Sequence, residues 1–218
     1  MFADFPESDW LPGAICVVAA ADDSEAALTQ AEAALVMQAV PRRRAHFAAG
    51  RACAHEALRR LGMPAVELLR TESGAPRWPA GCVGSISHCD RAAVALAASD
   101  EHWLALGIDV EPDQSLPDDV AGYAFGSDER ARLARLPGGM DAWGLLAFCA
   151  KECVHKCVHP LRGAFLEFED VEIDLDTGAA RFAPRAMTAA ARSALTGLHF
   201  EGRWRRHEGC LFVLLAVA

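Results

Sequence analysis

The stretch WLALGIDVEP, residues 103–112, joins a β-prone apolar run to two acidic residues and a closing proline. This pattern is typical of a strand that stops at Glu111-Pro112. Residues two apart on a strand point to the same face, so Asp109 and Glu111 present their carboxylates side by side. The spacing fits a pair of solvated acids at an exposed strand end. It also fits part of a Mg²⁺ site, because Mg²⁺ accepts hard oxygen ligands and leaves room for phosphate.

The segments on either side of this stretch predict an α+β fold with helices and strands in both halves. The two halves have similar lengths, which permits a duplicated architecture. Residues 71–81 are rich in glycine and proline and predict a loop, and residues 112–122 predict a linker or exposed loop. The expected strands cover residues 14–20, 83–87, 92–98, 103–110, 166–175, 178–182, 198–205 and 210–218. The expected helices run from an N-cap at Ser24 to about Ala39, from Pro41 to Gly62, from Ser127 to Leu136, from an N-cap at Asp141 to about Val158, and around residues 184–195.

The composition excludes several classes of protein. Hydrophobic residues make up 52% of the 218 residues, too many for a disordered chain. The formal charge of −9 argues against a general nucleic-acid binder. The apolar run at residues 14–21 is too short to span a bilayer and follows acidic residues, which is not the pattern of a signal peptide. We therefore expect a cytoplasmic monomer that contacts neither membrane nor nucleic acid, with its eight cysteines as free thiols.

The expected helix at residues 141–158 carries a third carboxylate between two lysines. Glu152 and Lys156 are four residues apart and share a helix face, and Lys151 lies a third of a turn away from Glu152. A carboxylate flanked by two ammonium groups suits a metal–phosphate site. The same pattern also occurs on salt-bridged surface helices.

Two further groups of residues suit phosphate binding. Ser87-His88 ends a short β-like run, where hydroxyl and imidazole groups can donate to an anion or be satisfied by a turn. Arg43 and Arg51 lie on the second expected helix, and Arg70 precedes the glycine- and proline-rich loop. Arginine forks match phosphate oxygens, although a basic surface can also be only solvated.

Two other patterns are weak indications of a metal site. His155 and His159 share a helix face as zinc ligands can, but the His-Glu-x-x-His motif is absent and Pro160 follows directly. Cys149, Cys153 and Cys157 form a stripe without iron–sulfur spacing, which favours core packing.

The order of these motifs resembles one family, the surfactin-synthetase-activating class of 4′-phosphopantetheinyl transferases, and within it the branch similar to enterobactin synthase component D. The fold that this resemblance implies is α+β, with two similar subdomains related by a pseudo-twofold and coenzyme A in the cleft between them. We place the subdomains at residues 1–108 and 109–218. The motifs that carry the resemblance are RRR-x-x-F-x-x-x-R (42–51), G-x-P-x-W-P (74–79), VGSISHC (83–89), GIDVEP (107–112), FCAKE-x-x-x-K (148–156) and L-x-F-E-D (166–170).

The resemblance also implies roles for individual residues. Three positions depart from the family pattern: Ser73 stands where relatives can have a basic residue, Arg70 where they often have lysine, and His155 where they usually have an aromatic residue. The implied Mg²⁺ ligands, with Mn²⁺ as an alternative ion, are Asp109, Glu111 and Glu152; the implied coenzyme A contacts are Arg43, Arg51, Arg70, Ser73, Ser87, His88, Lys151 and Lys156; and the implied catalytic residues are Glu152 and Lys156.

The implied activity is transfer of 4′-phosphopantetheine from coenzyme A to a serine of an apo acyl or peptidyl carrier protein, with release of 3′,5′-ADP. The carrier would serve polyketide, nonribosomal peptide (siderophore) or fatty acid synthesis, and the residues do not indicate which. Two alternatives stay open: a coenzyme A or nucleotide-binding module without catalysis, and a metal-dependent phosphohydrolase.

Overall fold

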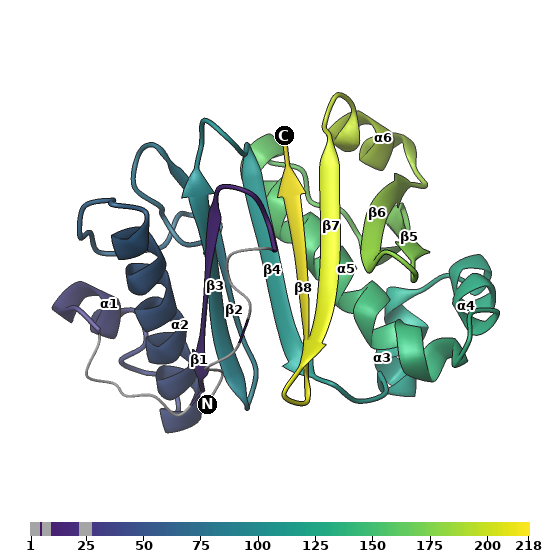
Figure 1. The fold of residues 1–218 in the computed structure, drawn as a ribbon, viewed down its shortest axis with the longest axis horizontal. Helices are drawn as coiled ribbons and strands as arrows, with labels where there is room; N and C mark the ends of the chain where they lie inside the picture. The colour runs from purple at the N-terminus through teal and green to yellow at the C-terminus, as the bar shows by residue number, and fades with distance from the viewer. Residues whose placement is uncertain (1–4, 6–9, 22–27) are drawn as a thin grey trace.

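The computed structural model of the chain describes residues 5, 10–21 and 28–218, and it repeats one β-α-β-β unit (Figure 1). The first unit contains β1 (Ala14–Ala20), α2 (Pro41–Arg60), β2 (Cys82–His88) and β3 (Ala92–Ser99). The second contains β4 (Ala105–Pro112), α5 (Gly139–Arg162), β7 (Phe200–His207) and β8 (Cys210–Val217). In both units the first strand pairs with the last, giving antiparallel orders β1-β3-β2 and β4-β8-β7. The prediction of an α+β fold with two similar halves is confirmed.

Insertions enlarge the second unit. Between β4 and α5 lie α3 (Asp118–Ala124) and α4 (Ser127–Ala134). After α5 come a 3₁₀ turn, η2 (Phe168–Asp170), then β5 (Val171–Asp176), β6 (Arg181–Ala186) and α6 (Ala189–Leu195). Strands β6 and β5 extend the second sheet to five strands in the order β4-β8-β7-β6-β5. In Figure 1 these insertions lie on one side of the molecule, opposite α1 (Gln30–Ala34) and α2.

The two sheets meet where the edge of β2 faces the edge of β4, and side chains rather than a strand ladder join them there. The backbone N–H of Ile108 donates to Ser85 Oγ at 3.1 Å, and Ser87 Oγ donates to Asp109 Oδ1 at 2.7 Å. Helix α5 packs closely on β4 because Gly107 has no side chain: a Cβ there would lie 2.4 Å from the carbonyl oxygen of Cys153. This close approach brings the middle of α5 next to the acidic end of β4.

Several predicted boundaries were wrong, each for a local reason. The expected cap Ser24 lies outside the described residues, and Thr29 caps α1 by accepting from the N–H of Glu32. Helix α5 starts two residues before Asp141, because Gly138 adopts a φ of 87° that favours glycine at this turn.

Two further segments also differ from the prediction. The expected linker at 112–122 contains most of α3. Pro184 belongs to β6 rather than to a helix. It is paired with Ile173 of β5 and lies beyond the two β6 residues that pair with β7, so no ladder hydrogen bond to β7 is lost there.

The proposed boundary between residues 108 and 109 falls inside β4, all of which pairs with β8. The two-subdomain division at that residue stays a prediction. No helix in the described part of the chain is long and apolar enough to cross a membrane.

Candidate functional site

Asp109 is the centre of a cluster that joins β2, β4 and α5. Its side chain is buried, and Oδ1 accepts from Ser87 Oγ and from the Lys156 ammonium, each at 2.7 Å. Lys156 also donates to the carbonyl oxygen of Ile108 at 2.8 Å. The carboxylate raises the pKa of Lys156 although burial opposes this, so the lysine is a fixed positive charge between the two units.

Two more carboxyl groups lie around this pair and hold protons more tightly than usual. Burial, followed by the charge of Asp109, raises the pKa of Glu111 to about 7. Burial also raises the pKa of Glu152, and Asp109 adds to the effect while Lys156 opposes it. Three acidic groups therefore share one neighbouring ammonium group, and they repel one another unless a proton or a cation compensates them.

The donor set suits a hard cation such as Mg²⁺, since it consists of carboxylate oxygens with incomplete charge compensation. Within residues 5, 10–21 and 28–218, no group of three or more His, Cys, Asp or Glu side chains is placed to hold a metal ion. Lys156 instead occupies the cation position at Asp109. The chemistry of the three carboxylates fits the ion.

A groove of about 500 Å³ runs from this cluster toward the start of α2, and Arg43, His46, His88 and Glu111 are among its lining residues. Arg43 Nη1 donates to His88 Nε2 at 3.2 Å. Burial, with the charges of Arg43 and His46, lowers the pKa of His88 to about 4, so the imidazole is neutral at pH 7. An anion in this groove would contact the guanidinium of Arg43. Its negative charge would offset the repulsion among the basic side chains that line the groove.

Comparison with known proteins identifies the family of the chain. Residues 31–98 match the 4′-phosphopantetheinyl transferase N-terminal domain, and residues 105–207 match the 4′-phosphopantetheinyl transferase superfamily. The 4′-phosphopantetheinyl transferase Svp of Streptomyces mobaraensis is 41% identical over 204 residues, which cover 91% of this chain and 82% of Svp. The chain belongs to the 4′-phosphopantetheinyl transferase family.

Two other transferases of the family are similar over most of their length. Npt of Nocardia iowensis is 35% identical, with 86% of this chain and 87% of Npt covered. PptT of Mycobacterium tuberculosis is 33% identical, with 85% of this chain and 84% of PptT covered. The residues matched by the two family models include the Asp109 cluster, Arg43 and His88.

Arg51 and Arg70 of this 4′-phosphopantetheinyl transferase lie apart from that groove and face one ring. Their guanidinium carbons lie 4.5 Å and 5.5 Å from the ring centroid of Phe47. Burial lowers the pKa of Arg51 to about 10; Glu32 opposes this, whereas the charge of Arg70 adds to it. Arg51 Nε makes no hydrogen bond, and its nearest acidic oxygen, on Glu32, is 3.9 Å away. The pair is an electropositive position that a phosphate would stabilise.

Ser73 and Lys156 both line a second, larger cavity of about 940 Å³, which lies between the two units of the transferase. Ser73 is exposed and shares a 2.9 Å hydrogen bond with Thr71. His155 and Trp78 also line this cavity, so the departures at residues 73 and 155 both lie on its wall.

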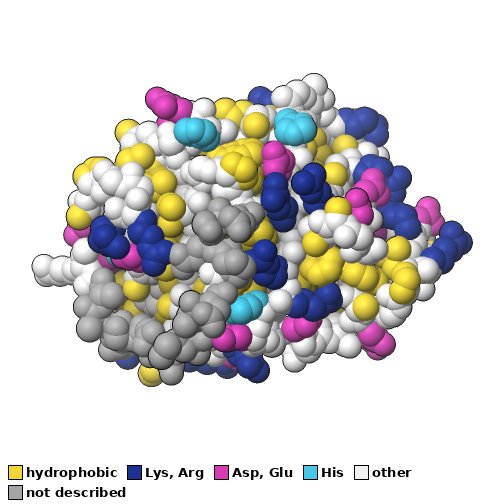
Figure 2. All heavy atoms as spheres, in the orientation of Figure 1, with side chains coloured by type: hydrophobic (Ala, Val, Ile, Leu, Met, Phe, Trp, Pro, Cys, Tyr) yellow, Lys and Arg dark blue, Asp and Glu magenta, His cyan; other side chains and the backbone are white. Residues whose placement is uncertain are grey.

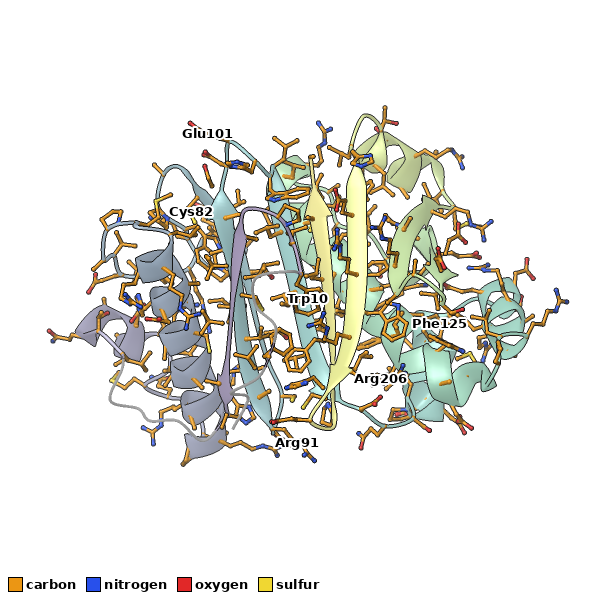
Figure 3. The ribbon with its side chains drawn as sticks, in the orientation of Figure 1. Trp10, Cys82, Arg91, Glu101, Phe125 and Arg206 are labelled. Carbon is orange, nitrogen blue, oxygen red and sulfur yellow. The ribbon has the colours of Figure 1, made fainter. Side chains whose placement is uncertain are left out.

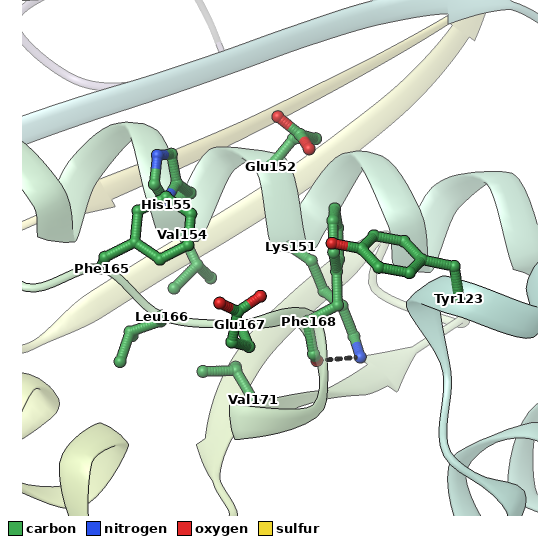
Figure 4. A pocket seen from close by; sticks show the side chains of 10 residues that line it. All are labelled: Tyr123, Lys151, Glu152, Val154, His155, Phe165, Leu166, Glu167, Phe168 and Val171. Atoms are coloured by element: carbon green, nitrogen blue, oxygen red, sulfur yellow. Dashed lines mark hydrogen bonds between the residues drawn. The ribbon is translucent and has the colours of Figure 1, made fainter. Parts of the chain in front are cut away.

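Lys151 does not join the phosphate-facing cluster. Its ammonium is buried and donates to Glu129 at 2.6 Å, to the carbonyl of Phe168 at 2.7 Å and to that of Ala124 at 2.9 Å. Figure 4 shows Lys151 and Glu152 leaving α5 on different sides, with Lys151 reaching Phe168. All three N–H groups have acceptors, so the structure places Lys151 as a support between α5, α4 and η2.

A small pocket of about 200 Å³ beside Glu152 was not predicted from the sequence (Figure 4). Tyr123, Phe165 and Phe168 supply its aromatic wall. Tyr123 and Phe165 are exposed and line this pocket together with Glu152. Their aromatic character was the available signal, but Tyr123 directly follows the segment 112–122 that was predicted to be a linker or exposed loop.

Three basic residues, Arg203, Arg205 and Arg206, lie on β7, where Figures 2 and 3 place basic side chains near the middle of the face seen in Figure 1. Arg206 donates to Asp113 at 3.0 Å and lies over the rings of Trp143 and Trp204. These contacts assign Arg206 to packing rather than to the site.

Replacing Lys151 with methionine should destabilise the fold more than a surface change does. The substitution leaves Glu129 buried with the N–H of Ile173 as its remaining strong partner. Breaking a buried pair in this way typically lowers the free energy of unfolding by about 3–5 kcal/mol. Urea denaturation measures the loss, and the exposed Arg59→Met variant, whose pair with Glu56 lies on the surface, should unfold nearly like the unchanged protein. Equal midpoints for the two variants would contradict a supporting role for Lys151.

Proposed function

We propose that this 4′-phosphopantetheinyl transferase moves the phosphopantetheine group of coenzyme A to a serine of an apo carrier protein at the cluster of Asp109, Lys156 and Glu152. The observation that carries the proposal is the Lys156 ammonium, which is held by Asp109 and the Ile108 carbonyl of the second unit and lies 3.4 Å from Ser87 Oγ of the first. A fixed cation at this position stabilises the negative charge of a pyrophosphate without rearranging during the reaction.

Coenzyme A would span the two units, with its charged end on the basic positions of the first. Arg43 and His88 line the groove next to Glu111, and Arg51 and Arg70 form a second cationic position over Phe47. Ser87 keeps Asp109 oriented by donating to it and is therefore a positioning residue in this proposal. Ser73 is assigned a contact with coenzyme A in the larger cavity that it lines.

In the transfer step the serine oxygen of the carrier forms a bond to the phosphorus nearest the pantetheine, and the bond from that phosphorus to 3′,5′-ADP breaks. Glu152 is the candidate acceptor of the serine proton, because burial raises its pKa and a stronger base takes the proton more readily near neutral pH. Lys156 is the candidate for offsetting the charge that builds on the leaving oxygen. Asp109, Glu111 and Glu152 would hold Mg²⁺ or Mn²⁺, which supplies further positive charge to the pyrophosphate oxygens.

The narrower assignment to the surfactin-synthetase-activating class, and to the branch similar to enterobactin synthase component D, is also part of the proposal. It rests on the six motifs named above and their order between residues 42 and 170. The dependence on Mg²⁺ and the monomeric state belong to the same proposal.

One incubation tests the function. The protein is mixed with coenzyme A, Mg²⁺ and an apo carrier protein, and the carrier is then weighed by mass spectrometry. We expect a gain of one phosphopantetheine group and release of 3′,5′-ADP. An unchanged carrier with intact coenzyme A would indicate a binding module, and coenzyme A consumed in the absence of carrier would indicate a phosphohydrolase.

A further inference from the structure

Glu32 is a carboxylate inside the first unit, at the place where α1 packs beside α2 (Figure 1). Its side chain is fully buried; Oε1 accepts from the N–H of Leu68 and Oε2 from the N–H of Thr29, each at 3.0 Å. His55 Nε2, on α2, lies 2.8 Å from Oε1. A buried acid is strongly destabilising unless such partners compensate it. The carboxylate therefore joins α1, α2 and the segment that leads to Arg70.

The same carboxylate faces Arg51 across a short distance. Glu32 Oε1 lies 3.9 Å from Arg51 Nε, and only 5% of the arginine side chain is exposed. Charges interact strongly over this distance where water is excluded. Because Arg51 Nε makes no hydrogen bond, Glu32 offsets the charge of the guanidinium without occupying this donor.

The second arginine of the pair depends on Glu32 through the backbone. Leu68 is fully buried and lies two residues before Arg70. The hydrogen bond from the Leu68 N–H to Glu32 therefore fixes the start of the segment that carries Arg70. Since Arg51 and Arg70 lie over the same ring, that of Phe47, one buried carboxylate supports both guanidinium groups.

The charges at this position leave a surplus that suits an anion. Burial raises the pKa of Glu32, but the N–H groups of Thr29 and Leu68 and the neighbouring His55 lower it on balance, so the carboxylate is ionised at neutral pH. One carboxylate beside two guanidinium groups leaves one positive charge uncompensated. It also weakens the repulsion that would drive the two arginines apart. Guanidinium groups held together in this way can bind the oxygens of one phosphate.

We propose that Glu32 is a positioning residue for coenzyme A, which holds Arg51 and Arg70 together so that both guanidinium groups contact a phosphate of the substrate. The inference rests on the proposed function, which assigns these two arginines to coenzyme A. Among the described residues, Glu32 lines neither the groove of about 500 Å³ nor the cavity of about 940 Å³. Its effect on the substrate therefore passes through the arginines, and it should act on binding rather than on the transfer step.

The test is calorimetric titration of the Glu32→Gln variant with coenzyme A, together with steady-state transfer to an apo carrier protein. Glutamine keeps the shape of the side chain and removes its charge. We expect Kd and KM for coenzyme A to rise about tenfold, the scale known for residues that hold a metal ligand in place, with kcat changed by less than about twofold. A merely structural role would instead reduce the amount of active protein, which lowers kcat and the binding stoichiometry but leaves KM as it was.

Glu172→Gln is the matched control. Glu172 is also a buried carboxylate paired with arginines, Arg132 and Arg185, but it lies on β5 in the inserted part of the second unit. This variant should keep the Kd for coenzyme A even if its thermal stability falls. An equal rise in Kd for the two variants, or an unchanged Kd for Glu32→Gln, would overturn the proposal.

A cycle of variants tests whether Glu32 acts through Arg51. Arg51→Gln should raise Kd at least as much as Glu32→Gln does, and the double variant should raise it by less than the product of the two separate factors. A rise equal to the full product would mean that the two residues act independently, against the proposal. If Glu32→Gln does not fold, Glu32→Asp keeps the charge but shortens its reach, and it should also raise Kd; an unchanged Kd would then decide against a positioning role.

Calorimetry separates this inference from the proposed function because it needs no turnover. A protein that binds coenzyme A but does not modify the carrier would contradict the proposed function, and its Kd values would still decide the role of Glu32. A protein that does not bind coenzyme A at all would contradict both.

Discussion

Replacing Glu152 with glutamine should lower the rate of phosphopantetheine transfer by about 10² or more, the scale of general base catalysis. Glutamine has nearly the same shape but cannot accept the serine proton. Burial raises the pKa of Glu152, which strengthens it as a base, and the side chain lies beside the Asp109–Lys156 pair and at the aromatic pocket. The loss should appear in kcat, while coenzyme A binding stays partly intact because the arginine positions are unchanged.

The rate of carrier modification by the Glu152→Gln variant measures the loss in kcat. Calorimetric titration with coenzyme A measures how much coenzyme A binding remains. Glu169→Gln is the matched control: it changes an exposed carboxylate on the neighbouring 3₁₀ turn and should transfer at the unchanged rate. Transfer by Glu152→Gln at nearly the unchanged rate would remove Glu152 from the mechanism.

Replacing Lys156 with glutamine should lower kcat by about 10²–10³, as expected when one preorganised charge donor is removed from an active site. The ammonium makes a 2.7 Å bond to Asp109 and a 2.8 Å bond to the Ile108 carbonyl, so the change also leaves a buried carboxylate without its cation. The expected result is slow transfer from a protein that still folds, because Ser87 continues to donate to Asp109.

Circular dichroism confirms folding, and the initial rate of carrier modification measures the loss. The control is Arg162→Gln in the last turn of the same helix, where an exposed cation bonds only a backbone carbonyl among its described contacts. This control should keep the full rate. If Lys156→Gln and Arg162→Gln transferred equally fast, the pyrophosphate would not depend on the Lys156 charge.

Much of the cluster could be predicted because its members obey short-range periodicity. Because residues two apart on a strand share a face, Asp109 and Glu111 were expected side by side. Because residues four apart on a helix share a face, Glu152 was expected near Lys156. The order of the six motifs then predicted that the chain is a 4′-phosphopantetheinyl transferase, and the comparisons confirm that family.

The role of Lys151 could not be predicted because its partners are distant in sequence. Its acceptors come from residues 124, 129 and 168, on segments that only the folded insertions bring together. Spacing along α5 shows how far Lys151 lies from Glu152 around the helix, but not which way the helix faces. The aromatic pocket was missed for the same reason, since Tyr123, Phe165 and Glu152 meet only in the tertiary structure.

The most direct measurement of the site is anomalous diffraction from crystals grown with coenzyme A and Mn²⁺. We predict a manganese peak between the carboxylates of Asp109, Glu111 and Glu152, with pyrophosphate density beside Lys156 and a phosphate near Arg43 and His88. A manganese peak elsewhere, or coenzyme A bound away from Lys156, would contradict the assignment of this cluster as the place where transfer occurs.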